Sequence, residues 1–134
     1  MSEIVKFVNR GAASITPAIA EKVLRHLPQW KLEFTQIAAP KFPHLVDQLE
    51  FLADAVEDAV EGAYKELPYA AVAQAVFALL YAHKKTSLIP ESILDLGRAD
   101  DSSVVRAVLI QNEKAFAIYA GTQGADWRKI TSQP

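Results

Sequence analysis

Four acidic side chains in the second half of the chain could bind a cation. They are Glu91, Asp95, Asp100 and Asp101. Carboxylate oxygens are the ligands that Mg²⁺ and Ca²⁺ prefer, and paired carboxylates also act as general acids and bases. A divalent-metal-dependent enzyme, or a small-ligand binder, that uses these residues is therefore one hypothesis for the function.

The adjacent pair Asp100 and Asp101 also fits a structural role. The pair precedes S-S-V-V-R-A-V-L, a segment typical of a helix start. An aspartate at that place accepts hydrogen bonds from free backbone N–H groups and interacts favourably with the positive end of the helix. We prefer this capping interpretation, and we expect neither a metal site nor a cofactor.

A second row of acids follows one side of the helix predicted over 44–65. Its members are Asp47, Glu50, Asp54, Glu57, Asp58 and Glu61. Such a row is typical of a solvated face, and binding of a basic partner or of divalent cations is the alternative. Phe51 projects beyond these acids, away from the apolar side of the helix. We therefore expect Phe51 to be exposed and to form a protein-contact surface with them, for example between two copies of the chain.

The basic residues offer weaker chemistry. His83, Lys84 and Lys85 end an apolar helix, where cations complement the negative helix terminus, and binding of an anion or lipid headgroup is the alternative. His26 and His44 are far apart and show no H-E-x-x-H spacing, so a histidine metal centre is not predicted. The chain also has no G-x-S-x-G elbow and no glycine-rich phosphate loop.

One longer segment resembles a known family. Residues 80–101 read L-Y-A-H-K-K-T-S-L-I-P-E-S-I-L-D-L-G-R-A-D-D. This resembles the motif of the YkvA-like family, a bacterial helical domain of unknown function, which reads roughly L-Y-F-x-x-P-x-D-L-I-P-D-F-I-P-x-L-G-x-x-D-D. The matched positions are Leu80, Tyr81, Leu88, Ile89, Pro90, Ile93, Leu96, Gly97, Asp100 and Asp101.

Other positions depart from the family motif. The replacements are Lys85 for proline, Ser87 for aspartate, Glu91 for aspartate, Ser92 for phenylalanine and Leu94 for proline. The resemblance therefore implies the helical scaffold of a divergent member, built around the motif residues Leu88, Ile89, Pro90 and Gly97. It implies no particular activity, and it does not extend to residues 1–40.

Composition excludes several classes of protein. With 134 residues, of which 51% are hydrophobic, the chain suits a single domain with its own core. A net charge of −2 argues against a nucleic-acid partner, which requires a basic surface. The absence of cysteine excludes disulfides and thiolate metal sites. The N-terminal sequence does not resemble a secretory signal, so we expect a cytoplasmic protein.

Local signals divide the first half of the chain. Thr16 followed by Pro17 is typical of a helix start, and apolar residues then recur at helical spacing up to Pro28. We also expect a short helix over 2–10, closed by Gly11. The segment 30–38 fits one or two helical turns, with a short strand as the alternative.

The most apolar helix is predicted over 69–85. Between residues 67 and 82, Gln74 is the only strongly polar side chain. This stretch would be about 24 Å long, shorter than the roughly 30 Å core of a bilayer. We therefore expect the central helix of a bundle, in which Gln74 is buried and hydrogen-bonded, and membrane association through residues 67–85 is the alternative.

The last part of the chain is predicted to begin with a motif turn over 90–97, which Gly97 closes with a positive φ. A helix from about Asp101 to Ala120 follows, with Gly121 as its terminator. The polar tail carries Trp127 and Ile130, which could pack back onto the bundle.

These predictions combine into an all-α protein with one helical domain over 1–134. N-terminal helices occupy 1–40, a YkvA-like core 44–120 and a polar tail 121–134, and about four main helices form a bundle with the motif turn between the last two. The leading functional hypothesis is a non-enzymatic interaction module that binds a protein partner or a second copy of itself. The metal-dependent enzyme and the membrane-associated protein are the alternatives.

Overall fold

The computed structural model describes residues 2–88, 91–130 and 132–134, and the side chains of 86–88 and 91–97 lie outside that description. Over these residues all of the regular secondary structure is helical, which confirms the all-α class. The elements are α1 (Glu3–Ala13), α2 (Pro17–Thr35), α3 (Leu45–Glu61), α4 (Tyr69–Leu88), α5 (Glu91–Gln111), α6 (Glu113–Thr122) and the 3₁₀ turn η1 (Trp127–Ile130). The expected number of about four main helices is too low.

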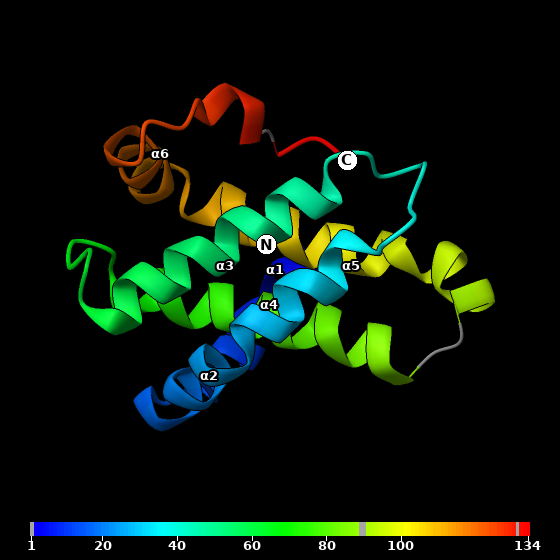
Figure 1. Ribbon diagram of the computed structural model, residues 1–134, viewed down its shortest axis with the longest axis horizontal. Helices are drawn as coiled ribbons and strands as arrows, with labels where there is room; N and C mark the ends of the chain where they lie inside the picture. The colour runs from blue at the N-terminus through cyan, green and yellow to red at the C-terminus, as the bar shows by residue number, and fades with distance from the viewer. Residues whose placement is uncertain (1, 89–90, 131) are drawn as a thin grey trace.

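Helix α4 is the centre of the fold. It packs against α1, α2, α3 and α5, which lie around it in Figure 1. Its alanines let these neighbours approach closely, and Ala71, Ala75, Ala78 and Ala82 are almost completely buried. The prediction of a central core helix is therefore confirmed. Among the described residues, no helix has both the length and the apolar character needed to cross a membrane.

Gln74 lies on the side of α4 that faces α1 and α5. Its side-chain amide donates to Asn9 Oδ1 at 3.5 Å, and its Oε1 accepts from Asn112 Nδ2 at 2.7 Å. The prediction that this amide is hydrogen-bonded is confirmed, although the residue is half-buried rather than buried. The two bonds join α4 to α1 and to the junction between α5 and α6.

The expected helix start at Thr16 is confirmed, because its hydroxyl accepts from the Ile19 N–H at 3.2 Å and Pro17 begins α2. The expected end at Pro28 is wrong, since α2 continues to Thr35. A proline inside a helix removes one backbone hydrogen bond and costs about 3 kcal/mol. Burial of Trp30 and Phe34 beyond it offsets that cost. Residues 30–35 are therefore helical, and the alternative strand is wrong.

Gly11 does not close α1 as expected, because the helix continues to Ala13. Its lack of a side chain serves packing instead. A β-carbon built at Gly11 would lie 2.2 Å from Phe77 Cε1 on α4. Glycine at this position therefore allows α1 to lie directly against the ring of Phe77.

The predicted motif turn is also wrong. Helix α5 begins at Glu91 and runs through Gly97 to Gln111, so Gly97 is not a terminator and no turn separates residues 91–97 from the rest of the helix. Glycine costs a helix only about 1 kcal/mol relative to alanine. The buried side of α5, with Val105, Val108 and Leu109, can offset that cost. Leu88 is the last residue of α4, while Ile89 and Pro90 lie outside the described residues.

The C-terminal segment folds back over α3. The predicted last helix divides at Asn112 into α5 and α6, and α6 ends at Thr122, just beyond the expected terminator Gly121. Trp127 and Ile130 pack against the core, as expected. The end of the chain then returns to the start of α3, where Gln48 Nε2 donates to the Gln133 carbonyl at 2.9 Å (Figure 1).

The packing predicts opposite effects for two glycine substitutions. Gly11→Ala should destabilise the protein by about 1–3 kcal/mol, because the new methyl group overlaps the ring of Phe77. Gly121→Ala should instead stabilise it by about 0.5–1 kcal/mol, since Gly121 is helical and a β-carbon there meets nothing within 4 Å. Urea unfolding measures both. If Gly11→Ala and Gly121→Ala change the free energy of unfolding equally, α1 does not pack as closely against α4 as described.

Candidate functional site

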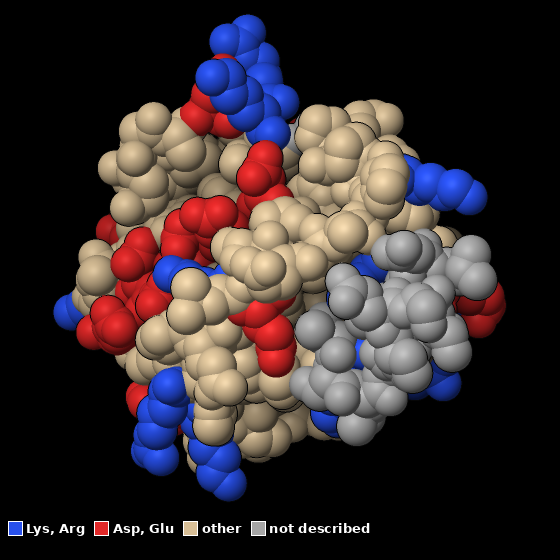
Figure 2. Space-filling view, turned by 45° about the vertical axis from the view of Figure 1, so that its right-hand side comes forward, with Lys and Arg blue, Asp and Glu red and all other residues tan. Residues whose placement is uncertain are grey.

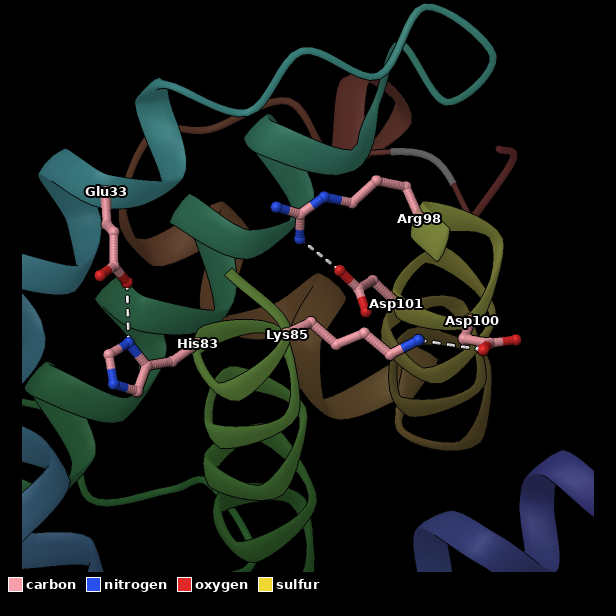
Figure 3. A network of polar contacts seen from close by, with 6 residues as sticks. All are labelled: Glu33, His83, Lys85, Arg98, Asp100 and Asp101. Carbon is pink, nitrogen blue, oxygen red and sulfur yellow. Dashed lines mark hydrogen bonds and ion pairs between the residues drawn. The ribbon is translucent and has the colours of Figure 1, made fainter. Parts of the chain in front are cut away.

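The acids of the motif region lie where α5 passes the end of α4. Asp100 and Asp101 are inside α5, not at its start, so the capping interpretation is wrong. Because the helix begins at Glu91, these two residues are already within its regular hydrogen-bonded part. Their side chains are free to bind other groups, and both contact basic residues (Figure 3).

Asp101 forms an ion pair with Arg98 one turn earlier on α5, and both side chains are buried. Burial raises the pKa of Asp101 above its usual value, and the adjacent guanidinium of Arg98 opposes that shift only in part. The pair is therefore a structural unit inside the helix. Removing one partner would leave an uncompensated charge in the protein interior.

Asp100 is exposed and accepts from Lys85 Nζ at 3.1 Å, which connects α5 to α4 (Figure 3). The Lys85 ammonium also lies 5.5 Å from the centre of the Tyr81 ring. Burial tends to lower the pKa of Lys85, but Asp100 and Tyr81 outweigh it, so the pKa is raised. Lys85 is thus held as a cation between an aromatic ring and a carboxylate.

His83 connects α4 to α2. Its Nδ1 lies 2.7 Å from Glu33 Oε2, and its ring stacks on Trp30 with centroids 4.1 Å apart. The basic end of α4 therefore directs His83 and Lys85 toward carboxylates of the same chain. This arrangement supports a structural role for that pair, rather than binding of a free anion or lipid headgroup.

The four acids proposed as metal ligands are only partly placed. Asp100 and Asp101 each face a cation, and the side chains of Glu91 and Asp95 lie outside the described residues. Within the described part of the chain, no group of three or more histidine, aspartate or glutamate side chains is arranged to hold a metal ion. In the described residues, the chemistry of this region is charge neutralisation, within α5 for Asp101 and between α4 and α5 for Asp100.

Phe51 does not form an exposed contact surface, and this expectation is wrong. The side chain is only 7% exposed, because α6 and η1 cover it. Its ring packs against Phe116, Tyr119 and Trp127, with centroids 5.6–5.8 Å apart. A projection of α3 alone cannot show this second layer of helices.

The acids around Phe51 remain accessible and form a cleft between α3 and the α6–η1 segment. The cleft has a volume of about 320 Å³ and is lined by Phe51, Asp54, Glu57, Asp58, Tyr119, Gln123 and Ala125. The Tyr119 hydroxyl donates to Asp58 Oδ2 at 2.5 Å. Burial and the adjacent Asp58 raise the pKa of Tyr119, so this hydroxyl stays protonated as a donor.

A lysine of the chain itself already binds this acidic surface. Lys31 reaches across from α2 and pairs with Asp54 at 2.7 Å and with Glu57. Burial alone would lower the pKa of Lys31, but the two carboxylates raise it. Asp54 keeps half of its side-chain surface exposed. These carboxylates can therefore bind a cationic side chain and still present oxygens to solvent.

Sequence reasoning did not identify Lys31 or Tyr119 as members of the site. Tyr119 and Lys31 lie on α6 and α2, whereas the acids lie on α3. Only the packing of α2 against α3, and of α6 over α3, brings them together.

Comparison with protein-family models, with curated proteins and with solved structures finds no match for the chain.

The raised pKa of Asp101 predicts a pH-dependent effect of its substitution. When a carboxyl group has a higher pKa in the folded than in the unfolded protein, its ionisation destabilises the folded state. The free energy of unfolding then decreases as the pH rises from the unfolded pKa, about 3.9, through the folded pKa. Asparagine does not ionise. We therefore expect the stability of Asp101→Asn, relative to wild type, to be more favourable at about pH 7 than at about pH 3.

Urea unfolding at the two pH values measures this difference. The variant Asp100→Asn, which removes one negative charge at the exposed neighbouring position, is the matched control. If the stability difference between Asp101→Asn and wild type does not change with pH, the buried charge does not behave as described.

Proposed function

We propose that the protein is a helical protein-interaction module that binds a basic segment of a partner through the acidic face of α3. This acidic face consists of Asp47, Glu50, Asp54, Glu57, Asp58 and Glu61. The observation that carries the proposal is the binding of Lys31 by Asp54 and Glu57. It supports the proposal because a lysine or arginine of a partner would make the same kind of contact.

The distribution of charge supports the proposal. Helix α3 contains six acidic residues and no lysine or arginine, whereas the net charge of the whole chain is only −2. Figure 2 shows acidic side chains gathered on one part of the surface, with a basic side chain enclosed among them. Complementary charge of this kind speeds association with a basic partner and selects against acidic ones.

The partner can be another protein or a second copy of the chain. Arg128 and Lys129, which are exposed on η1, could supply the cationic side chains in a homo-oligomer. Both forms of the proposal use the same acidic face. The Phe51 ring has no direct part in either, because it forms the floor under the acids.

A metal-dependent enzyme or small-ligand binder is the alternative. The observation that supports it is the exposed carboxylate of Asp100, which a cation could reach. Membership of the YkvA-like family is a further proposal, supported by the ungapped match over 80–101. The cytoplasmic location also remains a prediction.

Calorimetric titration with Mg²⁺, Ca²⁺ and Mn²⁺ tests the alternative. Because Asp100 and Asp101 already neutralise Lys85 and Arg98, we expect no stoichiometric binding that depends on them. Tight binding of one of these ions, lost in the double variant Asp100→Asn/Asp101→Asn, would place the metal-dependent function first.

The interaction proposal predicts that a cationic peptide binds the acidic face. In an NMR titration of the ¹⁵N-labelled protein with an octalysine peptide, the largest amide shifts should lie in residues 54–58 and 119–125. The double variant Asp54→Asn/Glu57→Gln should bind the peptide about tenfold more weakly, because two charge-assisted contacts lose their charge.

The double variant Glu3→Gln/Glu66→Gln is the matched control, since it changes the net charge equally at exposed positions away from the cleft. It should retain nearly the affinity of wild type. Equal weakening in both double variants would show that the peptide responds to overall charge, and the proposed site would then be wrong.

A further inference from the structure

An apolar groove lies beside the acidic face, between α2 and α3. Its volume is about 290 Å³, and it is lined by Pro28, Lys31, Leu32, Phe34, Thr35, Val46 and Glu50. Leu32 is 71% exposed, the highest exposure of any large apolar side chain in the described part of the molecule. Phe34 is buried and closes the groove from below.

The groove and the acidic cleft are parts of one continuous surface. Lys31 lines the groove, and its ammonium group pairs with Asp54 and Glu57, which line the cleft. On α3, Val46 and Glu50 line the groove, and the acids at 54, 57 and 58 line the cleft. The centres of the two sets are about eight residues apart, which corresponds to about 12 Å along the helix axis.

We infer that the partner docks as a basic amphipathic helix, with one aliphatic side chain in the groove and a lysine or arginine in the cleft. This inference rests on the proposed function. A helix lying along α3 spans about 12 Å in seven or eight residues, or about two turns. Residues i and i+7 lie on the same face, so an ordinary amphipathic helix can fill both hollows.

Charge complementarity determines this choice of occupant. Glu50 stands at the border of the groove and is exposed, and Asp54 follows it by one turn. Lys31 is the only basic residue that lines either hollow, and it is already paired with acids. An aliphatic anchor flanked by cations therefore fits the surface, whereas an acidic amphipathic helix would meet carboxylates along α3.

The test uses two fluorescent alanine–glutamine helical peptides of identical composition. In the matched peptide a central leucine has one lysine seven residues before it and one seven residues after it, so that either orientation of the helix fits. In the displaced peptide the lysines are five residues from the leucine, about 140° away around the helix. We expect the matched peptide to bind about tenfold more tightly in fluorescence anisotropy.

Leu32→Gln should weaken binding of the matched peptide about fivefold, because the leucine anchor loses its apolar contact. The substitution should leave the melting temperature unchanged, since Leu32 is largely exposed. Ile118→Gln is the matched control, because Ile118 is 56% exposed but lies outside the groove. It should bind the matched peptide as wild type does.

The two proposals fail in different ways. Equal affinity for the two peptides, no effect of Leu32→Gln, or no binding of the matched peptide would overturn the helix-docking inference. The octalysine titration would still report separately on the acidic face. If instead Asp54→Asn/Glu57→Gln changes neither octalysine nor matched-peptide binding, the proposed function itself is wrong.

Discussion

The burial of α4 is the constraint on which the rest of the structure depends. A helix that is apolar on nearly every side cannot face water, so other helices must cover it on all of those sides. Small side chains such as Ala75 and Ala78 let neighbouring helices approach α4 closely. Gly11 likewise lets α1 approach α4, because it has no side chain. The positions of α1, α2, α3 and α5 around α4 follow from this need. The His83–Glu33 hydrogen bond and the Lys85–Asp100 ion pair then attach α2 and α5 to its polar end.

One side of helix α3 covers α4, and the other side carries the acids of the candidate site. Its leucines Leu45, Leu49 and Leu52 are completely buried in the core. Phe51 lies outside that core and needs a second cover, which α6 and η1 supply. The cover stops beside Asp54, Glu57 and Asp58, and the cleft arises at that border. The acids are therefore held on an ordered, partly apolar surface, which favours specific docking over loose attraction of cations.

The sequence predicted the elements whose pattern is strong and failed where packing overrides a local signal. The periodicity of α3, the apolar content of α4 and the Thr16–Pro17 start all appear in the structure. Gly11, Pro28 and Gly97 suggested helix ends, yet all three lie inside helices, because burial of other side chains on the same helices, such as Val8, Trp30 and Val105, outweighs a local cost of about 1–3 kcal/mol. The acidic row could be read from the sequence. Its contacts with Lys31 and Tyr119 could not, because they depend on how separate helices pack.

The balance of charge distinguishes the two acidic regions. In the motif region, Asp101 is paired with Arg98 and Asp100 with Lys85, so each described acid has one cation. On the acidic face, Lys31 is shared between Asp54 and Glu57, and Asp58 accepts only the neutral hydroxyl of Tyr119. Negative charge therefore remains uncompensated at the surface of α3. The Lys85–Asp100 pair joins α4 to α5, and the Arg98–Asp101 pair lies within α5. The excess of negative charge beside an apolar groove is the feature on which the proposed binding of a basic partner rests.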